Sequence, residues 1–185
     1  MKNKSYIYLC IGFLFILMHF QIQLANGTIN FDILPDIIGY GLFAIGLHQL
    51  RHEHEQFRMA KNLNWYLLGL SIFNLIEVEG DPESLTVVSF TGLISIVQLI
   101  LLLRMVYRML EGIQEVAAVK DQRELLYLAQ SRWDHFLAFN IVSLLSFIIM
   151  FIPVVNVIFI FGLLIWMIVI AIMMMSFMYK SAKLL

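Results

Sequence analysis

Charged residues, prolines and cysteines are scarce in this chain. Asp, Glu, Lys and Arg make up 14% of its 185 residues, whereas about 25% is usual in soluble domains. The single cysteine, Cys10, excludes an intramolecular disulfide and a zinc site built on cysteines. The sequence also contains no phosphate-binding loop and no recognisable nucleophile–base or paired-acid motif. Nothing in it therefore favours an enzyme.

Hydrophobic residues are present in excess instead. They make up 61% of the chain, and the mean hydropathy is +0.86. A helix needs about 20 mostly apolar residues to cross a bilayer. Residues 1–185 are therefore expected to form one all-α, polytopic membrane bundle. Its six predicted transmembrane helices lie at about residues 5–24, 33–50, 63–78, 85–107, 134–153 and 154–178.

Two boundaries between these segments need a separate argument. The last two segments are nearly continuous, but Pro153 removes a helix hydrogen bond and disfavours helix at the residue before it. We therefore expect a turn there and not one long helix. The first segment follows Lys2 and Lys4 as a signal peptide would, but no clear A-x-A cleavage site follows it. We expect this segment to be retained, and its cleavage would leave five spans.

The charges are segregated on this topology. If the N-terminus is inside, all 12 Lys and Arg residues face the cytoplasm, in agreement with the positive-inside rule. We therefore predict a multi-pass protein of three hairpins with both termini in the cytoplasm. The inner bases are dispersed, which favours attraction to anionic lipid over nucleic-acid binding. The outer face carries no base and six acids: Asp32, Asp36, Glu77, Glu79, Asp81 and Glu83.

The connector between the fourth and fifth segments, at about residues 108–133, is amphipathic. Its apolar residues keep helical spacing on both sides of a break at residues 120–122. We expect the fourth helix to project into the cytoplasm, and an amphipathic helix to return along the inner surface with Trp133 at the headgroup level. The segment is then either a connector packed on the bundle or a docking surface for a partner protein.

The second segment begins with two acids and a proline, in FDILPDIIGY. Pro35 suits an early helical position, Asp32 is a candidate helix cap, and Asp36 is favoured by the helix dipole. Alternatively, Asp36 turns inward and holds a cation or a proton, because an ionisable residue within a span is a functional-site hypothesis by default. The polar residues that could line the same path are Asn74, Glu77 and Gln98.

The run from FLFILMHFQI to INFDILPDIIGYGLFAIGL resembles a signature, I-L-P-D-x-I-G-Y, of small uncharacterised polytopic membrane proteins of Gram-positive bacteria. The resemblance covers about the first 50 residues. It implies a protein of the bacterial cytoplasmic membrane and carries no activity. It also makes Pro35, Asp36, Gly39 and Tyr40 one unit. Gly39 and Gly46 share a helix face, where we expect close helix packing.

The outer turn, NLIEVEGDPESL, has alternating acids at its centre. Together with Asp32, the carboxylates of Glu79, Asp81 and Glu83 could supply oxygen ligands to a hard cation. The alternatives are a vestibule that concentrates cations, or charges that are simply solvated.

Histidines gather at the inner end of the second segment, in HQLRHEHE. His48 and His52 are spaced i, i+4, as in helical zinc sites, and His135 would reach the same level. The structural alternative is a solvated elbow. We expect no cofactor, although a bound metal cation stays open.

These features favour a small transporter or permeation protein for a cation or small solute, with an acidic outer mouth. The alternative is a membrane regulator or accessory subunit without enzyme activity that docks a partner through residues 108–133. A homo-oligomer or a membrane-protein partner stays open. Transport requires Asp36 or Glu77 to face a cavity, docking requires an exposed apolar stripe over residues 104–131, and an enzyme requires a convergent cluster such as the three histidines.

Overall fold

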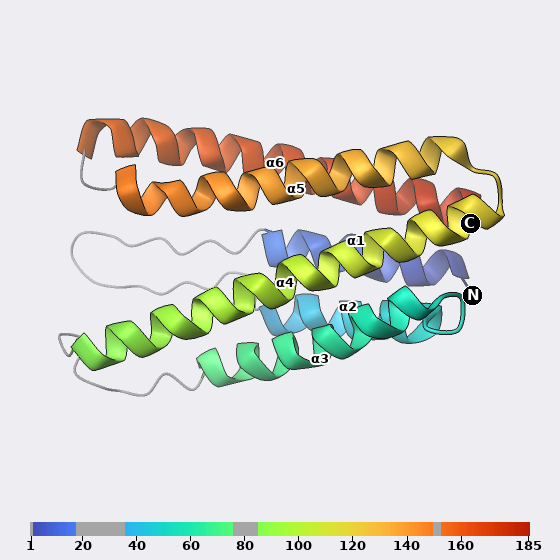
Figure 1. Ribbon diagram of the computed structural model, residues 1–185, viewed down its shortest axis with the longest axis horizontal. Helices are drawn as coiled ribbons and strands as arrows, with labels where there is room; N and C mark the ends of the chain where they lie inside the picture. Colours follow the sequence, from blue (N-terminus) through green and yellow to red (C-terminus); the bar gives the residue numbers. More distant parts are fainter. Residues whose placement is uncertain (1, 18–35, 76–84, 150–152) are drawn as a thin grey trace.

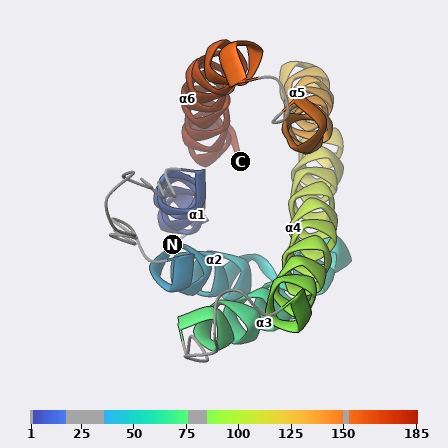
Figure 2. The same ribbon diagram turned by 90° about the vertical axis from the view of Figure 1, so that its left-hand side faces the viewer.

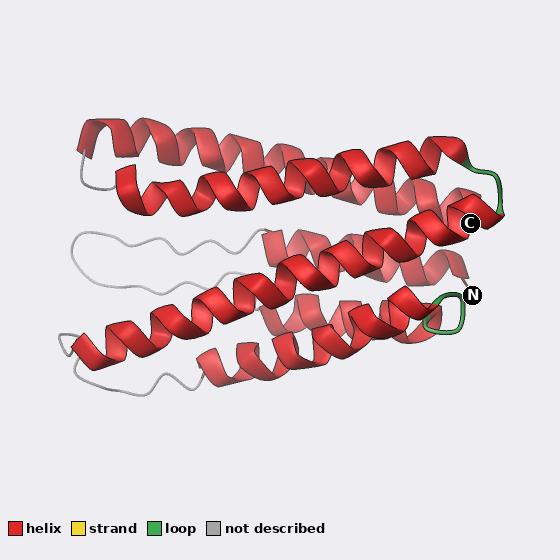
Figure 3. Cartoon of the chain, in the orientation of Figure 1, coloured by secondary structure: helices red, strands yellow, loops and turns green. Residues whose placement is uncertain are grey.

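The computed structural model describes residues 2–17, 36–75, 85–149 and 153–185. Over these residues the protein is all-α, with six helices and no strand, as the sequence predicts (Figure 3). The helices are α1 (Lys2–Leu17), α2 (Asp36–Leu50), α3 (Glu55–Leu75), α4 (Leu85–Val119), α5 (Arg123–Ile149) and α6 (Pro153–Leu184).

The helices form a ring in sequence order. Each packs against the helices before and after it in the chain, and contact between α6 and α1 closes the ring (Figure 2). Both termini and the two short turns, α2–α3 and α4–α5, lie at one end of the molecule (Figure 1). From this end α4 and α5 diverge, since α4 approaches α3 while α5 stays beside α6.

Local chemistry explains where the helices break. At the end of α4, Asp121 has a left-handed φ of 52°, and the amide N of Gln122 donates to the carbonyl O of Ala117 at 2.9 Å. This is a Schellman ending, which satisfies the last carbonyls of a helix. Pro153 opens α6, where its missing N–H has no helical partner to lose. The predicted break between the last two segments is therefore confirmed.

Two helices begin earlier than the hydropathy of the sequence predicts. α3 starts at Glu55 and not near residue 63, because Phe57 and Ala60 of its polar beginning are fully buried. α5 runs unbroken from Arg123 to Ile149. The expected amphipathic helix along the inner surface is therefore the first part of α5. Hydropathy places both helix starts too late in the sequence, because tertiary packing, and not average polarity, stabilises the first turns of these helices.

Among the described residues, two stretches are long and apolar enough to cross a bilayer: Leu93–Val119 in α4 and Ile158–Leu184 in α6. α1 contains a shorter apolar helix, Lys4–Ile16. α2 has 15 residues, and α3 and α5 begin with polar turns. Length and composition therefore give a weak indication of a membrane protein and do not by themselves establish six spans.

Burial is concentrated in the half of the bundle that carries the termini. Large apolar side chains there are fully buried, including Phe43, Leu47, Phe57, Met109, Ile113 and Met174. Towards the other end, large apolar side chains of α4, α5 and α6 are exposed, including Leu93, Ile96, Ile141, Leu144, Ile158 and Phe161. Exposed apolar surface on this scale is unusual for a soluble monomer and suits contact with lipid.

Candidate functional site

Two of the predicted polar residues, Asp36 and Gln98, come together in the structure around Tyr40. The side chain of Gln98 on α4 and the charge of Asp36 both act on the Tyr40 hydroxyl. Tyr40 is 2% exposed, and Oδ1 of Asp36 is shielded from solvent. Asp36 and Tyr40 are four residues apart on α2, so they share a helix face. Packing brings that face to Gln98.

Asn64 of α3 completes this group and is fully buried. Its Nδ2 donates to the carbonyl O of Tyr40 at 2.9 Å. Its Oδ1 is shielded from solvent and accepts no hydrogen bond from the described residues. A buried amide oxygen without a partner is costly in an apolar environment. We call Asp36, Tyr40, Asn64 and Gln98 the polar cluster.

The polar cluster lies deep within the bundle. Gln98 is 13 residues from the start of α4 at Leu85, which corresponds to about 20 Å along the helix. It also falls in Leu93–Val119, one of the two stretches able to cross a bilayer. The beginning of α2, which carries Asp36, lies near the middle of the molecule's long axis (Figure 1). The position of Asp36 at an outer mouth stays a prediction.

Two glycines hold α2 in this position. A Cβ atom at Gly39 would lie 2.6 Å from Cγ1 of Ile16, and one at Gly46 would lie 2.9 Å from the carbonyl O of Ser5. Both glycines therefore face α1 at a distance that no larger residue permits without movement. The adjacent face of α2, with Tyr40, is thereby directed to α3 and α4.

The side chains of the other residues predicted at the outer face lie outside the described residues. Asn74 lies in the last turn of α3, and its side chain is outside the described residues. The predicted outer acids other than Asp36 also lie outside the described residues: Asp32, Glu77, Glu79, Asp81 and Glu83. A cation site or vestibule at the outer turn stays a prediction.

The inner histidines are engaged by other groups. Nε of Arg51 donates to Nε2 of His52 at 2.9 Å, and Nη1 of Arg51 lies 3.3 Å from Nδ1 of His48. On α5, Nδ1 of His135 lies 2.7 Å from the carbonyl O of Ser131. Within the described residues, no three His, Cys, Asp or Glu side chains lie together in an arrangement that could hold a metal ion. The structure therefore does not bring the three histidines together.

The apolar stripe over residues 104–131 faces the protein. Its members Leu110, Ile113, Ala117, Leu125 and Ala129 are at most 2% exposed. The stripe packs in the half of the bundle that carries the termini, so these residues are not available to a docking partner.

Asn64 is the functional candidate that the sequence did not single out. It stands in a polar stretch, AKNLNWY, which reads as the solvated beginning of a helix. The one signal is its spacing from Phe57, Ala60 and Leu67, which places it on the same buried face. Comparison of the chain with protein-family models, curated proteins and solved structures finds no match.

Proposed function

We propose that this protein is a multi-pass protein of the bacterial cytoplasmic membrane that moves a cation or a small cationic solute through its helix bundle. In this proposal all six helices cross or enter the bilayer, and both termini lie in the cytoplasm. The position of both termini and the two short turns at one end of the bundle supports this topology. So does the distribution of all 12 Lys and Arg residues under the positive-inside rule.

The observation that carries the proposal is the polar cluster. Asp36 is an acid whose Oδ1 is shielded from solvent and whose charge acts on the Tyr40 hydroxyl, while amides of two other helices, Asn64 and Gln98, contact Tyr40. A carboxylate at membrane depth is costly unless it faces polar groups, and such residues mark ion and proton pathways. The carboxylate and amide carbonyl oxygens of the cluster are among the ligand types that hard cations prefer.

The docking alternative lacks a comparable observation. Its apolar stripe is buried, and the large apolar residues exposed beside it, Val119 at 89% and Tyr127 at 77%, lie on different helices. An enzyme built on the inner histidines is also unsupported, because Arg51 contacts two of them. Transport is therefore the function that the geometry supports best.

The experiment is a transport measurement on reconstituted protein. Proteoliposomes are fused to a solid-supported membrane, and charge movement is recorded on jumps in Na⁺, K⁺, Mg²⁺, Ca²⁺ or H⁺. We expect a saturable current for at least one cation. At a cation concentration well below saturation, Asp36→Asn should reduce the current by about tenfold or more, which corresponds to a loss of about 1.4 kcal/mol in cation binding.

The matched control is Asp134→Asn, which makes the same substitution at an exposed residue hydrogen-bonded to Gln130. It should leave the current unchanged. Gln98→Leu replaces the amide by an apolar side chain of similar volume and leaves the charge of Asp36 in place. It provides a second test if Asp36→Asn fails to fold. A current that persists in both folded cluster variants, or an equal loss in Asp134→Asn, would remove the role proposed for the cluster.

A further inference from the structure

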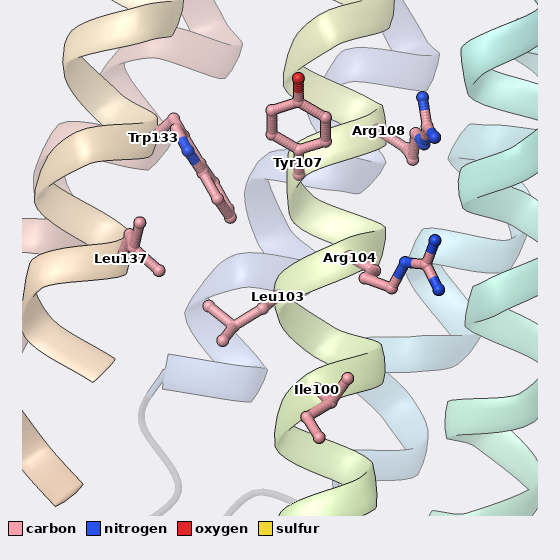
Figure 4. A pocket seen from close by; sticks show the side chains of 7 residues that line it. All are labelled: Ile100, Leu103, Arg104, Tyr107, Arg108, Trp133 and Leu137. Carbon is pink, nitrogen blue, oxygen red and sulfur yellow. The ribbon is translucent and has the colours of Figure 1, made fainter. Parts of the chain in front are cut away.

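A pocket of about 400 Å³ lies between α4 and α5, near the middle of both helices (Figure 4). Its apolar part consists of Ile100, Leu103 and Leu137. Beside it, the rings of Tyr107 and Trp133 meet edge to face, with their centroids 5.0 Å apart. The volume is in the range of small-molecule sites in proteins.

The polarity of the pocket changes along the helices. Two arginines of α4, Arg104 and Arg108, also line it, with their guanidinium groups on the side of α4 that faces α3 (Figure 4), and none of the lining residues is acidic. From Ile100 to Arg108 the helix rises about 12 Å towards the end with the termini. The apolar part therefore lies deeper in the bundle, and the cationic and aromatic part lies nearer the cytoplasmic end of the proposed topology.

The two arginines differ in what they contact. Nη1 of Arg108 lies 2.9 Å from Oε2 of Glu111 and 3.0 Å from Oε1 of Gln56, and the guanidinium stands over the Tyr107 ring. Its charge is thus largely compensated within the protein. Arg104 is exposed and has no acidic partner among the described residues. Its guanidinium is therefore available to an anion.

The pocket opens on the outside of the ring. In Figure 4, α1 and α2 lie behind α4, while Ile100, Tyr107 and Trp133 stand on the near side. Ile100 is 52% exposed, and exposed apolar residues continue beyond the pocket along both helices, at Leu93, Ile96, Ile141 and Leu144. The surface that runs from the pocket away from the termini is therefore apolar, and it lies between α4 and α5, which diverge in that direction (Figure 1).

We propose that this pocket binds one anionic phospholipid of the cytoplasmic leaflet. The phosphate lies against Arg104, Tyr107 and Trp133 lie at the level of the headgroup and glycerol, and an acyl chain follows Ile100, Leu103 and Leu137. Basic pockets between helices on the cytoplasmic side bind anionic headgroups, and Trp and Tyr favour this depth. The inference rests on the proposed membrane orientation and is independent of the polar cluster.

The test is lipid binding in detergent, measured by native mass spectrometry. The protein in a neutral detergent is titrated with phosphatidylglycerol or with phosphatidylcholine of the same acyl chains. We expect phosphatidylglycerol to bind at least about fivefold more tightly, the effect of one basic residue near an anionic headgroup. Arg104→Gln should remove this preference, and it should fold because no side chain of the described residues pairs with Arg104.

The matched control is Arg58→Gln, which removes the same charge from an exposed arginine on α3 that is paired with Glu55. It should leave the preference intact. Equal binding of the two lipids, an unchanged preference in Arg104→Gln, or an equal loss in Arg58→Gln would overturn the proposal. Displacement of phosphatidylglycerol by millimolar inorganic phosphate would also overturn it, because the pocket would then take a soluble anion.

A second measurement locates the acyl chain. Trp133 is kept as the single tryptophan by Trp65→Phe and Trp166→Phe, and phosphatidylglycerol with brominated acyl chains is added. Bromine quenches tryptophan fluorescence at short range. We expect saturable quenching of Trp133 that Arg104→Gln weakens. No quenching would contradict an acyl chain in this pocket. Because neither measurement involves transport, a failure here and a failure of the transport assay are distinguishable.

Discussion

At the scale of single residues, shielding from solvent distinguishes polar groups of similar chemistry. Asp36 and Asp134 are both helical aspartates, but Oδ1 of Asp36 is shielded while Asp134 is exposed. Asn62 and Asn64 are two residues apart, yet Asn62 is exposed and Asn64 fully buried. A charge or amide that water solvates contributes little specificity, whereas a shielded one must be satisfied by the protein or by a ligand.

The glycines of α2 give a prediction at this scale. Gly46→Ala puts a methyl group 2.9 Å from the backbone carbonyl O of Ser5, so α1 and α2 must separate. We expect the free energy of unfolding to fall by about 1–3 kcal/mol, as for other overpacked sites. Unfolding in a mixed detergent titration measures this change.

Gly41→Ala is the matched control, because no atom lies within 4 Å of a Cβ built there. It should leave stability unchanged or raise it by up to about 1 kcal/mol through the higher helix propensity of alanine. If the two variants unfolded at the same detergent fraction, the close α1–α2 contact would not contribute to stability.

At the scale of elements, α4 and α6 are longer than the hydrocarbon core of a bilayer is thick. α4 has 35 residues and α6 has 32, so they are about 52 and 48 Å long, against about 30 Å for the hydrocarbon core of a bilayer. Their C-terminal ends therefore extend beyond the bilayer in the proposed topology. There, Lys180 pairs with Glu124, and Lys120 donates to the carbonyl O of Leu185.

The α4–α5 turn provides the prediction for this scale. Asp121 adopts a left-handed φ of 52°, which costs about 1 kcal/mol or more for residues with a Cβ. Asp121→Gly should therefore raise the free energy of unfolding by up to about 1 kcal/mol. Asp121→Ala removes the same ion pair with Arg123, at 3.6 Å between two exposed side chains, but keeps the Cβ.

Exposed ion pairs contribute little to stability, so an increase in the free energy of unfolding should appear in Asp121→Gly and not in Asp121→Ala. Thermal unfolding of both variants in detergent checks this expectation. Equal melting temperatures would show that the turn carries no backbone strain.

At the scale of the whole molecule, the ring places both termini and two turns at one end. This arrangement and the proposed orientation predict which sites a membrane-impermeant maleimide reaches in intact cells. In a Cys10→Ser background, Asp81→Cys should be labelled. Val119→Cys, whose parent residue is 89% exposed, should react only after the membrane is permeabilised. Labelling of Val119→Cys in intact cells would reverse the orientation, and the background without cysteine controls for nonspecific reaction.

Several features of this protein were determined by its sequence alone. Composition identifies an apolar helical protein, because 61% hydrophobic residues with few charges leave few alternatives. Pro153 separates the last two helices because its ring lacks an N–H, whatever the surroundings. The position of Gly39 and Gly46 on one face of α2 is also determined by the sequence, since helical periodicity places residues seven apart on the same face.

Other features were decided only by the tertiary structure. Tyr40 and Gln98 are far apart in the chain, and no local pattern indicates that the Gln98 side chain acts on the Tyr40 hydroxyl. The stripe over residues 104–131 is amphipathic whether it faces a partner or its own bundle, and only the packing of α4 and α5 decides in favour of the bundle. The pocket beside Arg104 likewise depends on two helices diverging. Local sequence determines which face of a helix is apolar, but what covers that face is a property of the whole assembly.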